Sequence, residues 1–175
     1  MDVKELASTI RVVPDFPKPG ISFKDITTLL KNPQAFAEAI ELLASKLSGL
    51  DFDIIVAPEA RGFIIGAALA YKMGKGFVPV RKPGKLPWKT LSGSYSLEYG
   101  VDRLEIHVDA VEPGQKVLVL DDVLATGGTV CATIDLVKKL GGNVVGVAFL
   151  IELTYIGGRQ NLKDFKVISA IELEQ

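Results

Sequence analysis

The chain has 175 residues, of which 48% are hydrophobic and 23% charged, and its formal net charge at pH 7 is −1. These values predict one globular domain with a substantial core, and the lack of a basic surplus argues against a nucleic-acid-binding protein. Apolar runs such as 63–71 and 144–151 are too short to cross a bilayer, so we expect no membrane span. One cysteine, Cys131, excludes an intramolecular disulfide and is typical of a cytoplasmic protein.

The N-terminal part predicts two helices with an irregular segment between them. Apolar residues recur at helical spacing over residues 3–13, so we expect a short amphipathic helix there. The segment 14–27, PDFPKPGISFKDIT, contains three prolines and is predicted to be extended and rich in turns. Asn32 followed by Pro33 is typical of a helix start, and Gly49 of its end.

A strand, a charged loop and a helix are predicted next. DIIVA, residues 53–57, is apolar and β-branched and reads as a core strand. PEARG, residues 58–62, forms the loop, and residues 63–73 form a helix whose small residues allow close packing. The loop places charged side chains at the end of a buried strand.

A short strand over 76–81 is followed by a basic, broken segment. No acidic residue occurs from 77 to 97, whereas four cations do: Arg81, Lys82, Lys85 and Lys89. This pattern predicts a mobile loop over about 81–97 that attracts anions. A plain solvated loop remains the alternative.

Residues 116–140, KVLVLDDVLATGGTVCATIDLVKKL, predict a strand, a loop and a helix. The apolar run 117–120 is a strand buried on both faces, and 130–140 has the spacing of an amphipathic helix. The loop between them, residues 121–129, is acidic at one end and glycine-rich at the other.

This loop suits a sugar phosphate. Glycines at a helix start expose backbone N–H groups to an anion, and two aspartates at a strand end suit hydroxyls or a divalent cation. Neither the P-loop motif nor G-x-G-x-x-G is present. The plainer interpretation is a glycine-rich turn with two solvated aspartates.

The remaining segments are predicted strands. Residues 94–99 and 104–108 alternate in polarity and predict a hairpin around Gly100, and 143–151 and 166–171 are β-rich. Alternating strands and helices predict an α/β fold with a mostly parallel, twisted sheet flanked by helices on both faces. We expect residues 1–175 to form one domain.

VLVLDDVLATGGT resembles the ribose-phosphate-binding signature of type I phosphoribosyltransferases: four hydrophobic residues, two acids, then small residues ending in TGGT. Over roughly residues 5–160 the chain is similar to the adenine-specific branch of that family. The resemblance implies a Rossmann-like domain with a small hood from about residues 1–30. It also implies a pentosyl-transferring glycosyltransferase of purine salvage, which moves ribose 5-phosphate from phosphoribosyl pyrophosphate (PRPP) to adenine and gives AMP and pyrophosphate.

The resemblance implies roles for individual residues. The 5-phosphate and ribose of PRPP would be held by Asp121, Asp122, Ala125, Thr126, Gly127, Gly128 and Thr129. The pyrophosphate would be held by Glu59, Ala60, Arg61, Arg81, Lys82 and Lys85, with the Glu59-Ala60 peptide in cis. Arg61 is also a candidate catalytic residue. Glu98 would handle the purine proton, with Tyr99 beside it.

Adenine is implied to lie between Phe23 and Val123, where backbone groups of Ser22 and Lys24 read its edge. A backbone N–H and C=O pair complements the ring nitrogen and exocyclic amine of adenine. A 6-oxo purine reverses that pattern and leaves both groups unpaired, at roughly 1–3 kcal/mol each.

The family also implies Mg²⁺ as cofactor, held mainly through PRPP and water with no direct protein ligand, and a homodimer in which the basic loop serves its own or the partner's site. Two other functions stay open. One is phosphoribosyl transfer to hypoxanthine, guanine, xanthine or orotate. The other is a PRPP-sensing regulator that has lost the chemistry.

Overall fold

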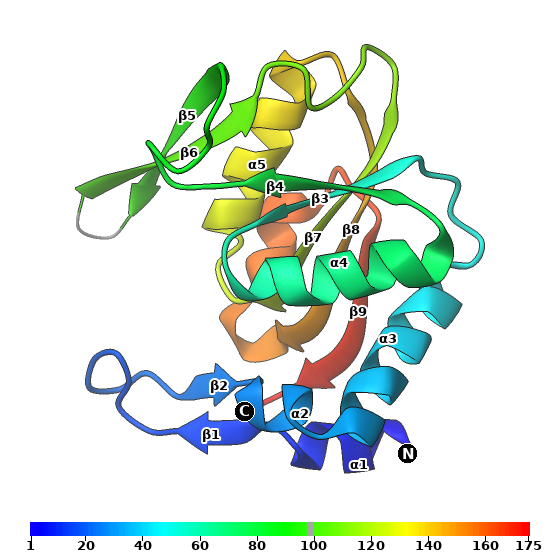
Figure 1. The fold of residues 1–175 in the computed structure, drawn as a ribbon. Coiled ribbons are helices and arrows are strands. Elements are labelled where there is room, and N and C mark those ends of the chain that lie inside the picture. Colours follow the sequence, from blue (N-terminus) through cyan, green and yellow to red (C-terminus); the bar gives the residue numbers. More distant parts are fainter. Residues whose placement is uncertain (98–99) are drawn as a thin grey trace.

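The computed structural model describes residues 1–97 and 100–175, and its centre is a five-stranded parallel sheet in the order β4-β3-β7-β8-β9 (Figure 1). The strands are β3 (Ile54–Pro58), β4 (Gly76–Val80), β7 (Lys116–Leu124), β8 (Asn143–Leu153) and β9 (Val167–Leu173). The predicted α/β fold with a parallel sheet is therefore confirmed. None of the helices in the described ranges is long and apolar enough to cross a membrane.

Helices cover both faces of the sheet because alternate residues of its strands point to opposite sides. Leu118 and Leu120 of β7 join a core with α1 (Val3–Ser8), α3 (Pro33–Leu47) and α4 (Arg61–Met73). Val117 and Val119 join a second core with α5 (Gly128–Lys139) on the other face. Both faces of β7 are thus apolar, as the continuous run predicted.

The predicted helix over 3–13 is wrong in its second half. α1 ends at Ser8, where the hydroxyls of Ser8 and Thr9 donate to backbone carbonyls of the preceding turn. β1 (Arg11–Val13) then pairs antiparallel with β2 (Phe23–Asp25). Adjacent valines in β1 favour a strand once a partner strand is available, and this tertiary pairing overrides the apolar spacing.

The strands β1 and β2 and the short helix α2 (Thr27–Leu30) lie beside the carboxyl end of the sheet (Figure 1). We call this group, residues 11–30, the hood. The hood is thus a two-stranded sheet with one helical turn rather than a purely extended segment.

A second antiparallel pair, β5 (Thr90–Leu97) and β6 (Gly100–His107), forms a hairpin where one was predicted, with Leu97 opposite Gly100. Its strands begin earlier than predicted, and Gly100 is the first residue of β6 rather than the turn. β5 packs on α5 at Gly93, where an added Cβ would lie 3.1 Å from Leu136 Cδ2. Only residues 81–89 of the predicted basic loop are therefore irregular. Closure of the 81–97 segment over a ligand stays a prediction.

β7 is longer than predicted, because it continues through both aspartates to Leu124. Its partner β8 accompanies it, with Asp121 opposite Phe149 and Val123 opposite Ile151. The predicted loop of residues 121–129 is wrong in its first part, since only 125–127 separate strand and helix. The carboxylates are consequently fixed by the sheet rather than by a turn.

Candidate active site

Two adjoining cavities lie at the carboxyl ends of β7 and β8. The larger, about 540 Å³, lies between the hood and the sheet and is lined by Gly20, Ile21, Ser22, Phe23, Lys24, Arg61, Asp121, Asp122, Val123, Ala125, Thr129, Leu153, Tyr155 and Ile156. The smaller, about 100 Å³, is lined by Asp121, Val123 and the residues from Ala125 to Val130. Both cavities include Asp121, Val123, Ala125 and Thr129, so their contents would touch.

The smaller cavity is built from the start of α5. Gly127 has φ 87°, a left-handed conformation that favours glycine, and it is the N-cap of a helix beginning at Gly128. No side chain among the described residues caps this helix. The first-turn N–H groups and the positive end of the helix dipole are therefore available to an anion.

Asp122 is engaged by the arginine at the start of α4. Arg61 Nε donates to Asp122 Oδ2 at 2.5 Å, and the Asp122 side chain is only 6% exposed. The Arg61 guanidinium also lies 5.3 Å from the centre of the Phe23 ring in the hood. A cation at a helix N-terminus is unfavourable by the dipole, and Asp122 offsets that cost here.

Asp121 lines both cavities and has an unusual environment. Desolvation by the surrounding protein and the charge of Asp122 raise its pKa well above the ordinary value of 3.8. Its Oδ1 accepts from the N–H of Asp122 at 2.8 Å. A Cβ on Gly62 would lie 2.9 Å from that oxygen, so the glycine makes room for the carboxylate.

The residues predicted for adenine come together. Ser22, Phe23, Lys24 and Val123 all line the larger cavity. Lys24 is buried, and its Nζ donates to Ser22 Oγ at 3.1 Å. The hood thus faces β7 across the cavity, with an aromatic ring on one side and an aliphatic side chain on the other.

The other residues predicted for pyrophosphate do not line this cavity. The Glu59-Ala60 peptide is cis, as expected. Glu59 Oε1 accepts from Arg81 Nε at 3.2 Å and from the backbone N–H of Lys82 at 2.8 Å. Lys85 lies in the same irregular segment, where its N–H donates to the Lys82 carbonyl. Of the predicted pyrophosphate residues, Arg61 alone lines the cavity.

Glu98 and Tyr99, the predicted proton-handling residue and its neighbour, lie outside the described residues. Their assigned roles stay predictions.

Sequence patterns missed several residues that the fold brings to the cavities or to the loop and helix start beside them. Tyr155 and Ile156, in a 3₁₀ turn η1 (Thr154–Ile156), line the larger one. Asn161, in the following 3₁₀ helix η2 (Gly158–Leu162), donates from Nδ2 to the Thr126 carbonyl at 2.8 Å. Tyr95 of the hairpin approaches Gly128, where an added Cβ would lie 4.0 Å from its ring. Each follows from tertiary packing and carries no periodic signal.

A helix start whose N–H groups are available to an anion, beside a hooded cavity on an open parallel sheet, is typical of a nucleotide-binding protein. The comparison with known families narrows this class. Residues 25–174 match the model of the phosphoribosyl transferase domain. The chain therefore belongs to the phosphoribosyl transferase family.

Three relatives in that family are adenine phosphoribosyltransferases. An adenine phosphoribosyltransferase of Symbiobacterium thermophilum is 62% identical over 98% of this chain and 99% of its own length. The crystal structure of the Thermoanaerobacter pseudethanolicus adenine phosphoribosyltransferase superposes with a TM-score of 0.96, at 57% identity, over 98% of this chain and 100% of that one. The structure of the Saccharomyces cerevisiae adenine phosphoribosyltransferase was solved with adenine and an imino-altritol bisphosphate. It superposes with a TM-score of 0.90, at 37% identity, over 97% of this chain and 98% of that one. The branch of the family is thus that of the adenine phosphoribosyltransferases.

Proposed function

We infer that the protein transfers ribose 5-phosphate from PRPP to adenine, forming AMP and releasing pyrophosphate. One observation carries the inference: the hooded cavity between Phe23 and Val123 adjoins the anion site at the start of α5. Bound side by side, a base in the first and a phosphate in the second would sit at the two ends of one nucleotide. The relatives' shared activity supports the same conclusion.

The hood supports selection of a 6-aminopurine. A planar base fits between the Phe23 ring and Val123, both of which line the cavity. Backbone groups of Ser22 and Lys24 would then pair with the ring nitrogen and the exocyclic amine. A 6-oxo purine would leave these groups unpaired, which disfavours hypoxanthine, guanine and xanthine.

In the reaction, the bond from ribose C1 to the pyrophosphate oxygen breaks while a bond from C1 to the purine nitrogen forms. Electrons of the broken bond leave with pyrophosphate, so positive charge develops on the ribose. The first-turn N–H groups of α5 would hold the 5-phosphate and fix the sugar. Arg61 would stabilise the charge on the departing pyrophosphate, and Glu98 would accept the purine proton.

The basic segment would complete the pyrophosphate site. Arg81 and Lys82 are held at the end of β4 by the Glu59 carboxylate, close to the start of α4. Together with Lys85 they supply cations on the side of the cavity from which pyrophosphate would leave. Movement of residues 81–89 toward the ligand would also exclude water from the ribose.

We propose Mg²⁺ as the cofactor. The chemistry fits, because the Asp121 carboxylate lines both cavities, where it would accept hydrogen bonds from water bound to the ion, and a nearby cation would lower its raised pKa. The described residues contain no cluster of three or more metal-ligating side chains, so phosphate oxygens and water would form the coordination shell. When bound, the ion would neutralise charge on the diphosphate. A homodimer and a cytoplasmic location stay predictions, the first to be checked by analytical ultracentrifugation.

A pyrophosphate-release assay with PRPP, Mg²⁺ and each purine in turn tests the proposal. We expect release with adenine and much slower release with hypoxanthine or guanine. Faster turnover of a 6-oxo purine would assign a different base. PRPP binding without release of pyrophosphate from any base would instead favour the regulator.

A further inference from the structure

We propose that Asn161 is a positioning residue for the 5-phosphate, acting through the peptide between Thr126 and Gly127. This inference rests on the proposed function, since it concerns how the same anion site is kept ready. Asn161 lines neither cavity. Its side chain donates to the Thr126 carbonyl in the loop that lines the smaller cavity, and its own carbonyl accepts from Cys131 Sγ of α5 at 3.8 Å.

The geometry of a peptide unit carries the argument. Asn161 Nδ2 donates to the Thr126 carbonyl at 2.8 Å. The Thr126-Gly127 peptide is trans, because the cis bonds lie elsewhere, and in a trans peptide the C=O and the following N–H point in opposite directions. Holding the Thr126 carbonyl toward Asn161 therefore turns the Gly127 N–H away from it. Gly127 lines the small cavity and Asn161 lines neither cavity, so an N–H turned away from Asn161 would face the bound anion.

The peptide needs such a restraint. Gly127 has φ 87° and no Cβ, so its backbone has more accessible conformations than any other residue type would allow. Thr126 is exposed, and the loop between β7 and α5 is only three residues long, 125–127. Rotation of this one peptide would replace a donor by a carbonyl oxygen facing the phosphate. The Asn161 amide opposes that rotation.

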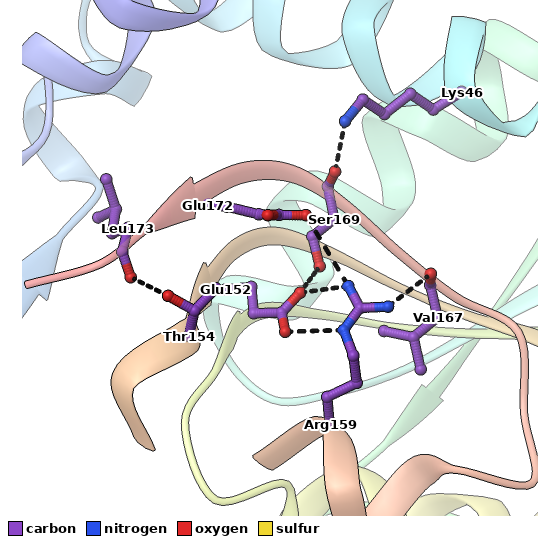
Figure 2. Close-up of polar contacts among 8 residues, drawn as sticks. All are labelled: Lys46, Glu152, Thr154, Arg159, Val167, Ser169, Glu172 and Leu173. Atoms are coloured by element: carbon purple, nitrogen blue, oxygen red, sulfur yellow. Dashed lines mark hydrogen bonds and ion pairs between the residues drawn. The ribbon is translucent and has the colours of Figure 1, made fainter. Parts of the chain in front are cut away.

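Asn161 itself is held by a rigid support, drawn in Figure 2. Arg159, two residues earlier in η2, donates from Nε and Nη2 to the two carboxylate oxygens of Glu152 at 2.9 and 2.5 Å. Ser169 Oγ donates to Glu152 Oε2 at 2.6 Å, and Arg159 Nη1 donates to the Val167 carbonyl at 3.3 Å (Figure 2). Glu152 is only 4% exposed. The start of η2 is thereby fixed to both β8 and β9.

A second contact fixes η2 against the loop. A Cβ on Gly158 would lie 2.0 Å from the Ala125 carbonyl oxygen, so no other residue fits at this approach. Gly158 is also buried. Two contacts thus fix the start of η2, and Leu162 at its other end is buried, so the Asn161 amide stands at a defined position beside Thr126. The support therefore restrains the loop without touching the ligand.

The test compares binding of two ligands to the same variant. In Asn161→Ala the Kd for AMP and the KM for PRPP should rise roughly three- to tenfold, the value of one neutral hydrogen bond. The Kd for adenine should stay unchanged, because adenine has no phosphate. Asn161→Asp keeps the shape of the side chain, but the carboxylate cannot donate a hydrogen bond at neutral pH. This variant should weaken AMP binding at least as much as Asn161→Ala does.

Gln160→Ala is the matched control. It removes the same amide group one residue earlier in the same exposed turn, and we expect wild-type affinity for both ligands. Melting temperatures of the ligand-free variants should match that of the wild type, which separates positioning from folding. Equal AMP affinity in Asn161→Ala and wild type would overturn the inference, as would an equal loss of adenine binding. Wild-type protein that binds neither AMP nor PRPP would overturn the proposed function itself.

Discussion

Arg61 and Asp122 form an ion pair that joins the first turn of α4 to the end of β7, with Arg61 Nε 2.5 Å from Asp122 Oδ2. The carboxylate is buried, whereas the arginine side chain is 42% exposed and lines the larger cavity. Asp122 thus holds the guanidinium at the cavity wall. The pair ties a candidate catalytic group to the most buried part of the site.

Asp122→Asn should lower kcat/KM for PRPP by about ten- to a hundredfold, the range expected when a hydrogen bond loses its charge. The neutral amide no longer holds Arg61, so the cation would be displaced from the pyrophosphate. Initial rates at varied PRPP check this. Asp135→Asn, an exposed carboxylate on α5, is the control and should behave as wild type. Normal kinetics in Asp122→Asn would show that the pair does not position Arg61 for the reaction.

Asp121→Asn should stabilise the ligand-free protein at neutral pH. The folded pKa of Asp121 is raised above its unfolded value, so folding favours the protonated form. The contribution of Asp121 to stability is therefore fully present below its pKa in the unfolded state. That contribution is lost as the pH rises through its pKa in the folded state. The amide does not titrate, so the variant keeps that contribution while turnover falls.

Chemical denaturation of wild type and Asp121→Asn across a pH series measures this difference. The two free energies of unfolding should diverge as pH rises from 3.8 toward neutrality. A constant gap between the curves would mean that Asp121 titrates normally.

Gly62→Ala should impair PRPP use without a large loss of stability. The new methyl group would lie 2.9 Å from Asp121 Oδ1 and displace that carboxylate from its place in the cavity wall. We expect about a tenfold rise in the KM for PRPP, comparable to one lost charged hydrogen bond. Gly66→Ala on the same helix is the comparison, because its methyl would lie 2.7 Å from Phe77 Cε2 in the core.

Thermal melts and kinetics of both variants separate the two effects. Gly66→Ala should melt lower and keep its KM, since overpacking costs stability. The assignment of Asp121 to the ribose fails if Gly62→Ala binds PRPP as wild type does.

Glu98→Gln should keep the affinity for PRPP and lose most of its turnover. A glutamine cannot accept the purine proton, and general-base catalysis contributes typically 10²–10⁴-fold. Isothermal titration measures the affinity for PRPP, which should stay unchanged, and initial rates measure kcat, which should fall. Unchanged turnover would remove Glu98 from the mechanism.

The sequence predicted the parts of the fold that depend on local pattern. The apolar run after Lys116, the glycines before Val130 and the Asn32-Pro33 helix start predict a strand and the starts of two helices, and the structure contains β7, α5 and α3 at these places. These signals are strong because a doubly buried strand and a capped helix leave few alternatives.

What the sequence could not reveal depends on contacts between distant segments. The strand Arg11–Val13 exists because Phe23–Asp25 pairs with it, although spacing favoured a helix. Asn161 reaches Thr126 only after β8, η1 and η2 have folded back beside the loop. Neither the strand pairing nor this hydrogen bond is indicated by the spacing of residues within its own segment.

The two halves of the site have separate origins in the chain. The smaller cavity is lined by β7, the loop after it and α5, whereas the larger cavity takes one wall from the hood, which precedes the sheet in the chain. Replacement of the hood would alter which nucleobase is accepted and leave the residues that would bind the sugar phosphate unchanged. The architecture is modular in that sense, and a family built on it can diversify in base preference by changes confined to its first thirty or so residues.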